Sequence, residues 1–193
     1  MLFRSNVIGF DSGPGNVLMD AWTRAHRDEA FDRDGTWAMS GSVHSPLLKR
    51  MLAEPYLKLP APKSTGRELF NRNWLQHYLD QLLEEVPPVD VQATLLEYTA
   101  QTIRLGIEMA GIDPTEIYLC GGGAHNAALL NRLAALHHPN TVQTTQALGI
   151  APEWVEAVAF AWLARQALQG HSVAVSPVTG ASADAILGAV YAA

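Results

Sequence analysis

Two short apolar runs each end in a glycine-rich turn that leads into a helical pattern, and these two junctions constrain the fold more than any other feature. The first run covers residues 7–10, and the second covers residues 116–120. Strands that alternate with helices are typical of α/β proteins with a parallel or mixed sheet. We therefore expect a single α/β domain over residues 1–193, with a mixed sheet flanked by helices.

The composition indicates a well-packed core and a surface with few charges. Apolar residues make up 48% of the chain and charged residues only 17%, against roughly 25% in an average globular protein. Large apolar patches on a surface usually mark an interaction site. We therefore expect part of this chain to lie against a missing lobe or, in a homodimer, against a second copy.

Charge, cysteine content and hydropathy argue against several classes of protein. The net charge of -6 opposes nucleic-acid binding, which requires clustered lysine and arginine. Cys120 is the single cysteine, so the chain has no internal disulfide and suits a reducing compartment. No apolar run reaches the roughly 18 residues that span a membrane, and the start of the chain does not have the pattern of a signal peptide. We expect a cytoplasmic protein that is not inserted in a membrane.

Capping residues and apolar periodicity predict the elements of the first half of the chain. Asn16 is a favourable N-cap, and Ser45 followed by Pro46 is typical of a helix start. Residues 65–68 have the form of a capping box, and Asp90 is expected to cap the next helix. We predict a strand at residues 7–10, a strand or hairpin around Trp37, a short helix from Ser45, and helices over residues 16–27, 65–85 and 90–110.

The second half of the chain continues the alternation. Strand-like runs cover residues 116–120 and 141–144. Helical patterns cover residues 126–137, 152–169 and 182–192. The pattern of residues 152–169 is apolar nearly all round, which is typical of a buried helix.

The first glycine junction has the residues of a phosphate site. Backbone amides at a helix start attract anions, and Gly13 and Gly15 would let a phosphate approach the backbone closely. Asp11 could hold magnesium through water, and Asn16 could cap the helix or contact a phosphate. The alternative is a tight turn with an ordinary cap, which the spacing alone favours.

The second glycine junction offers a surface without side chains. A planar base could lie against Gly121, Gly122 and Gly123, with Asn126 as helix cap or nucleotide ligand. The alternative is a flexible turn, but three consecutive glycines are costly in backbone entropy, so a binding role is slightly favoured. The pattern is not a Walker loop, because it lacks the pair of lysine and serine or threonine. It is not a dinucleotide fingerprint either, because its glycine spacing differs.

Outside the junctions, one carboxylate and one polar segment are candidate site features. Glu156 is the only charge in an apolar helical run, so it should face a cleft, a cation or a ligand; an exposed glutamate in a first helical turn is the equal alternative. Lys63 and Arg67 could bind an anion, but the spacing favours a capped helix start with solvated charges.

Metal catalysis through histidine and nucleophilic catalysis through cysteine are not indicated. The seven histidines form no helical pair backed by an acid, as metalloproteases require. No base lies next to Cys120 in the sequence, so we interpret it as a small buried residue. The only metal that we expect is magnesium, bound through water at Asp11.

Four segments resemble, in order, those of the anhydro-N-acetylmuramic acid kinases. They cover residues 9–16, 62–68, 120–126 and 156–164, and the likeness extends over nearly the whole chain from Ile8. Four motifs in order are far more specific than any one of them. That family belongs to the superfamily of sugar kinases, Hsp70 and actin, whose members place ATP and substrate between two ribonuclease-H-like lobes.

The resemblance implies that residues 1–193 are the C-terminal lobe of a two-lobed kinase whose N-terminal lobe is missing. It implies a fold of the ribonuclease-H-like actin, sugar-kinase and Hsp70 type, a mixed sheet flanked by helices. It also implies three groups of site residues: phosphate and magnesium at Asp11, Gly13, Gly15 and Asn16, adenosine at Gly121, Gly122, Gly123 and Asn126, and substrate at Glu156.

The implied reaction uses ATP, Mg²⁺ and water to convert 1,6-anhydro-N-acetylmuramic acid to N-acetylmuramate 6-phosphate, in the recycling of cell-wall sugar. The resemblance places the first phosphate loop and the aspartate that activates water in the missing half. No catalytic residue is therefore expected here, and the isolated chain should be inactive. Two alternatives stay open: a free-standing nucleotide-binding half that acts as a non-catalytic subunit or regulator, and a kinase for another sugar.

Overall fold

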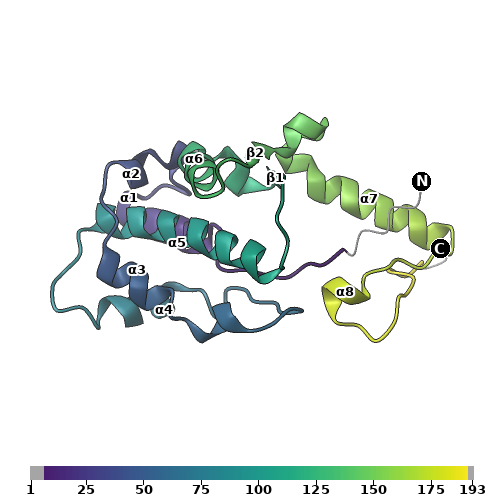
Figure 1. Ribbon diagram of the computed structural model, residues 1–193, viewed down its shortest axis with the longest axis horizontal. Helices are drawn as coiled ribbons and strands as arrows, with labels where there is room; N and C mark the ends of the chain where they lie inside the picture. Colours follow the sequence, from purple (N-terminus) through teal and green to yellow (C-terminus); the bar gives the residue numbers. More distant parts are fainter. Residues whose placement is uncertain (1–6, 191–193) are drawn as a thin grey trace.

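The computed structural model describes residues 7–190 as a helical body with an extension at one end (Figure 1). The helical body contains the first six helices and both strands, and the extension contains the last two helices. The helices are α1 Val17–Arg27, α2 Thr36–Met39, α3 Ser45–Met51, α4 Arg72–Leu79, α5 Pro88–Met109, α6 Ala127–Leu136, α7 Val155–Leu168 and α8 Ser176–Thr179, and the strands are β1 Glu116–Leu119 and β2 Thr141–Thr144.

The two strands pair in parallel and form the only sheet of residues 7–190. Glu116 lies opposite Thr141 and Leu119 lies opposite Thr144, and α6 connects the strands as a crossover helix. This unit confirms both predicted strands and the α/β class in its coarse form, a small parallel sheet flanked by helices. The ribonuclease-H-like lobe stays a prediction.

Helix α5 is the centre of the core. Leu95, Tyr98 and Ala100 are fully buried along it, and α1, α2, α3 and α6 pack around it. The indole nitrogen of Trp22 on α1 donates to the carbonyl of Pro88 at the start of α5, at 2.8 Å. Helix α5 covers most of the expected range and ends just before Gly111, whose positive φ of 66° suits a helix end.

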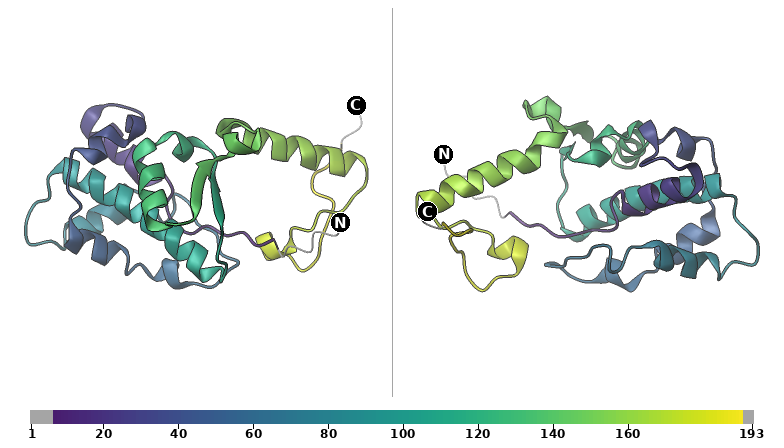
Figure 2. Two further views of the ribbon diagram at one scale, coloured as in Figure 1. Left: turned by 45° about the horizontal axis from the view of Figure 1, so that its top comes forward. Right: turned by 180° about the vertical axis from the view of Figure 1, so that it is seen from behind.

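Helix α7 projects away from the helical body, and α8 lies beneath its far end (Figures 1 and 2). A 3₁₀ turn, Pro152–Trp154, precedes α7, so the predicted helix 152–169 is confirmed with an irregular first turn. No residue of α7 is buried, although its sequence is apolar nearly all round. The extension contacts the helical body through α8, because a Cβ built on Gly9 would lie 2.8 Å from the side chain of Val178.

Two predicted strands are wrong. Residues 7–10 run as a single segment outside any ladder, and the amide of Asp11 instead donates to the carbonyl of Lys63 at 3.1 Å. The segment around Trp37 is helical, because the buried carboxylate of Asp32 accepts from the amides of Trp37 and Ala38, both at 2.9 Å. Apolar runs reveal neither the long-range bond of Asp11 nor the side-chain bonds of Asp32.

Several helix boundaries also differ from the prediction. Of the helix expected over residues 65–85, only α4 forms. The amide of Thr65 donates to Asp11, and Asn71 provides the N-cap instead. His44, rather than Ser45, caps α3, and Asp90 lies inside the first turn of α5 rather than at its cap. Residues 182–190 contain no helix, and the rest of the last predicted helix lies outside the described residues.

Candidate functional site

The first glycine junction packs directly on α5. A Cβ built on Gly13 would lie 2.5 Å from the hydroxyl of Thr102, so a larger residue would have to displace that side chain. Gly15 has a φ of 56°, and its carbonyl accepts from the hydroxyl of Thr99 at 2.9 Å. Packing and backbone conformation therefore account for these two glycines, as the turn alternative requires.

Asn16 connects the two glycine junctions. It occupies the N-cap position of α1, but its side chain makes no capping hydrogen bond. Its amide group lies instead against the second junction, because a Cβ built on Gly123 would be 3.1 Å from its Oδ1. The fold thus brings together two motifs from opposite halves of the sequence, and the Asn16 side chain has no hydrogen-bond partner among residues 7–190.

The second junction is fixed at both ends. Gly121 has a φ of 70°, and its amide donates to the carbonyl of Pro152 at 3.0 Å. Asn126 accepts from the amide of Leu129 at 3.0 Å, which confirms the predicted cap of α6. Residues between these ends form a 3₁₀ turn, Gly122–His125, rather than a flexible loop.

Two pockets flank Asn16, and each takes its name from its charged residues. The arginine pocket has a volume of about 550 Å³ and the aspartate pocket about 500 Å³, both within the range of ligand sites. Both contain Asn16 and Asp20. The arginine pocket adds Gly15, Arg24, Arg67, Arg72, Cys120 and Gly123, and the aspartate pocket adds Phe31, Asp32, Arg33, Asp34, Gly122, His125 and Asn126.

The position of Cys120 corrects the sequence interpretation. Its side chain is exposed rather than buried, and it lines the arginine pocket. The residue directly follows β1, where the chain leaves the sheet for the glycine turn, so no packed layer covers it. In the part of the chain that the structure describes, no three His, Cys, Asp or Glu side chains form a metal cluster.

Asp11 is held by the polar segment at residues 62–68. Its Oδ2 accepts from the hydroxyl of Ser64 and from the amide of Thr65, both at 2.9 Å. Its Oδ1 has no hydrogen-bond partner among residues 7–190. Asp11 lines neither pocket. An exposed carboxylate oriented in this way can steady a hydrated magnesium ion or accept a proton.

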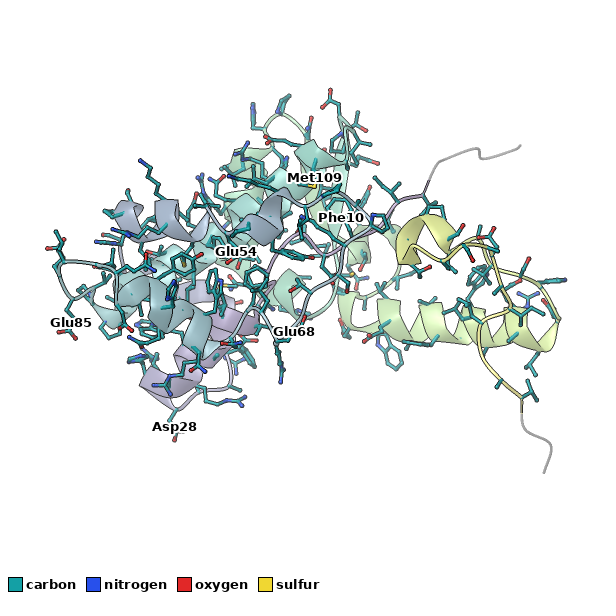
Figure 3. The ribbon with its side chains drawn as sticks, turned by 90° about the horizontal axis from the view of Figure 1, so that it is seen from below. Phe10, Asp28, Glu54, Glu68, Glu85 and Met109 are labelled. Carbon is teal, nitrogen blue, oxygen red and sulfur yellow. The ribbon has the colours of Figure 1, made fainter. Side chains whose placement is uncertain are left out.

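The two cations of that segment have different surroundings. Lys63 donates to the carbonyls of Tyr56 and Leu57, and burial lowers the pKa of its amine. It anchors the segment and is not free for a ligand. Arg67 lines the arginine pocket instead. Figure 3 labels Glu68, the residue after Arg67, and Phe10, both on the side of the helical body that faces the extension.

The charges of α1 affect both pockets. Burial raises the pKa of the Asp20 carboxyl, and the nearby Arg24 partly opposes that shift. Burial also lowers the pKa of His26, and the charge of Arg72 lowers it further. The arginines therefore create a locally positive field in a chain whose overall charge is negative.

Glu156 does not join this site. It is exposed in the first turn of α7, lines neither pocket, and has no ion pair in the described part of the chain. Its link to the site is indirect: the amide of Gly121 donates to the carbonyl of Pro152, the residue that begins the turn before α7. In this structure Glu156 matches the alternative of an exposed first-turn glutamate.

Sequence reasoning missed several residues that line the pockets. Asp20 and Arg24 lie one and two helical turns beyond Asn16 on α1, so helical periodicity alone would have placed them on its face. No comparable signal marked Phe31, Asp34 or Arg72, because only the packing of separate segments brings them near the glycines.

A family model described as anhydro-N-acetylmuramic acid kinase matches residues 2–193. Proteins with that name from Pseudomonas syringae pv. tomato and Saccharophagus degradans are 51% and 49% identical over 187 residues, which is 97% of this chain. One from Coxiella burnetii is 49% identical over 186 residues, 96% of this chain. The chain spans 50–51% of the length of these relatives. Between residues 7 and 190, none of the helices combines the length and apolarity needed to cross a membrane.

Proposed function

Because the chain belongs to the anhydro-N-acetylmuramic acid kinase family, we propose that it is the C-terminal, nucleotide-binding half of an ATP-dependent kinase of 1,6-anhydro-N-acetylmuramic acid. The observation that carries this proposal is the convergence of both glycine junctions on Asn16, between two pockets. Glycine backbone next to a free amide side chain and charged walls suits a nucleotide. The proposed setting is the cytoplasm.

The aspartate pocket is the proposed nucleoside site. Gly122 and Asn126 lie on one wall, where a base can approach the backbone, and Phe31 offers an aromatic face. Asp20 and Asp34 are acceptors for ribose hydroxyls. The phosphates would then extend past Asn16 toward Gly13 and Gly15, and Asp11 would hold magnesium through water.

The proposed reaction needs groups that act on the sugar as well as on ATP. Water would add to C1 of the sugar as the bond from C1 to O6 breaks, and a base would take the proton of the water. The 6-oxygen would then receive the γ-phosphoryl group as ADP leaves, and bound magnesium would balance the phosphate charge. Asp11 can serve this chemistry by steadying hydrated magnesium or by accepting a proton from water. Glu156 is the proposed sugar ligand, and this role requires a second lobe that lies between α7 and the pockets.

A second lobe is the proposed partner of α7. Phe160, Trp162 and Leu168 are 64%, 50% and 73% exposed, and Trp154 just before the helix is 61% exposed. An apolar patch of this kind marks an interaction surface. The alternative occupant is a second copy of this chain, as in a homodimer.

The test is a calorimetric titration of the chain with ATP and Mg²⁺, followed by a coupled kinase assay. We expect saturable ATP binding, and turnover of the anhydro sugar only after addition of the first half of the Pseudomonas syringae relative. The control variant is Gly123→Val, whose branched side chain would meet Asn16. Turnover by the isolated chain would contradict the half-enzyme proposal. Absence of ATP binding both with and without the partner would contradict the proposed nucleotide site.

A non-catalytic nucleotide-binding subunit is the second candidate. The observation in its favour is that both pockets are formed by this chain alone. It predicts ATP binding and a complex with the partner, but no turnover in the coupled assay. The same experiment therefore separates the two functions.

A further inference from the structure

The arginine pocket collects three cations from separate elements. Arg24 comes from α1, Arg67 from the turn before α4, and Arg72 from the first residue of α4. Asp20 is the only carboxylate in its lining, so the lining carries a formal net charge of +2. This excess stands out in a chain with 13 basic and 19 acidic residues.

Among residues 7–190, none of these three guanidinium groups has a hydrogen-bond or ion-pair partner. By contrast, Arg27 contacts Glu29 at 3.1 Å, and Arg132 forms a fork with Glu97 at 2.6 and 2.8 Å. Within residues 7–190, the pocket's three arginines make no side-chain hydrogen bond and no ion pair. A planar guanidinium presents donors that match the oxygens of phosphate or carboxylate.

The other walls of the pocket favour a bound anion. Phe70 and Leu129 are buried, and Ile103 and Leu119 are half-buried, so apolar groups back the pocket. A low-dielectric wall strengthens the attraction between the arginines and an anion. The neighbouring aspartate pocket contains three carboxylates, Asp20, Asp32 and Asp34, and one arginine, Arg33, so its lining favours an anion less than that of the arginine pocket.

We propose that the arginine pocket is an oxyanion-binding site in which Arg24, Arg67 and Arg72 together hold one phosphate or carboxylate group. Two sources share this chemistry: the phosphates of a nucleotide and the carboxylate of a sugar acid. The site is inferred from its side chains alone, and only the identity of its natural ligand rests on the proposed kinase function.

The first test follows the Nε–Hε signals of the arginines by NMR. The ¹⁵N-labelled chain is titrated with inorganic phosphate, with N-acetylmuramic acid, and with neutral N-acetylglucosamine, at constant ionic strength set by NaCl. Saturable shifts confined to Arg24, Arg67 and Arg72 are expected for at least one anion and not for the neutral sugar. Arg165 on α7 is the internal reference. Equal shifts at Arg165, or no saturable shift with either anion, would overturn the proposal.

Variants make the test quantitative. Arg67→Gln and Arg72→Gln should each weaken anion binding about tenfold, which corresponds to the loss of one charge-assisted hydrogen bond. Arg165→Gln removes the same charge from an exposed position outside both pockets and should leave affinity unchanged. Unchanged binding in both pocket variants would contradict the proposal, and thermal unfolding of each variant checks that the chain is still folded.

The two anions identify the source. Preference for phosphate assigns the pocket to the nucleotide, whereas preference for N-acetylmuramic acid over phosphate assigns it to the sugar carboxylate. If the anion binds but ATP and turnover assays fail, the site stands and the kinase proposal fails. If ATP binds normally while the pocket variants have no effect on any anion, the kinase proposal stands and the oxyanion site fails.

Discussion

Gly13 and Asn16 show that neighbouring residues of one motif have different physical roles. Gly13 is required where the chain passes close to α5, and Asn16 faces the second glycine junction. Gly13 therefore bears on stability, whereas Asn16 is a proposed binding residue. The sequence places both residues in a single phosphate-type motif and cannot separate these roles.

Replacing Gly13 by alanine should lower the free energy of unfolding by about 1–3 kcal/mol, because the new Cβ would lie 2.5 Å from the Thr102 hydroxyl. The measurement is urea unfolding of the chain. Gly122→Ala is the matched control, because its Cβ would meet only Asn16 at 3.7 Å. Equal stability of the two variants would contradict the packing argument.

The two asparagines at helix starts should respond differently to alanine. Asn126→Ala removes a bond to the Leu129 amide and should cost about 1 kcal/mol of stability. Asn16 makes no capping bond, so Asn16→Ala should change stability by less than about 0.5 kcal/mol while it weakens ATP binding. Unfolding and calorimetry are measured on both variants, and a large stability loss in Asn16→Ala would show that its side chain does cap α1.

At the scale of elements, α5 is joined to α6 by charge as well as by packing. Glu97 on α5 is buried, and its carboxylate accepts two hydrogen bonds from Arg132 on α6 and one from Gln101. Burial pushes the pKa of Glu97 upward, but the hydrogen bonds from Arg132 and Gln101 outweigh it, and the net pKa is lowered. The pair therefore stabilises the chain in the ionised form.

Arg132→Met should destabilise the chain by roughly 1–3 kcal/mol at neutral pH, because it leaves Glu97 buried without its main partner. A lowered folded pKa contributes stability above the unfolded value, near 4.5, and loses it as the pH falls through the folded value. The difference between wild type and variant should therefore shrink below about pH 4.5. Urea unfolding across pH 3–7 measures it, and a pH-independent difference would argue against the ion pair.

The whole molecule consists of a helical body and an extension whose helix α7 exposes large apolar side chains (Figures 1 and 2). The low charged fraction of the sequence predicted exposed apolar surface, although the fraction alone could not assign that surface to α7. Because no residue of α7 is buried, its apolar side chains add little to the stability of this chain.

The double variant Phe160→Ser and Trp162→Ser should leave urea stability within about 0.5 kcal/mol of wild type, because both side chains are at least half exposed. It should weaken complex formation with the first half of the Pseudomonas syringae relative at least tenfold, as measured by calorimetry. The paired control is Leu95→Ala in the core, which should cost about 2–5 kcal/mol. Undiminished complex formation by the double variant would show that α7 is not the docking surface.

The sequence by itself determined the helices α1, α5, α6 and α7, both strands, and the positions of the glycine turns. Local periodicity, caps and backbone freedom specify these features over a few residues. It failed at residues 7–10, around Trp37 and at residues 65–71. Asp11 accepts from the amide of Thr65 in another segment, and Asp32 accepts from the amides of Trp37 and Ala38. Apolar periodicity does not reveal bonds of this kind.

Only the tertiary structure decided the composition of the site. It brought Asn16 against Gly123, gathered Arg24, Arg67 and Arg72 around one pocket, bound Lys63 to nearby carbonyls, and left Glu156 outside. These outcomes depend on how α1, α4 and the turn after β1 pack against α5. Packing is a property of surfaces that meet across the fold, so it follows from the whole chain and not from any single motif.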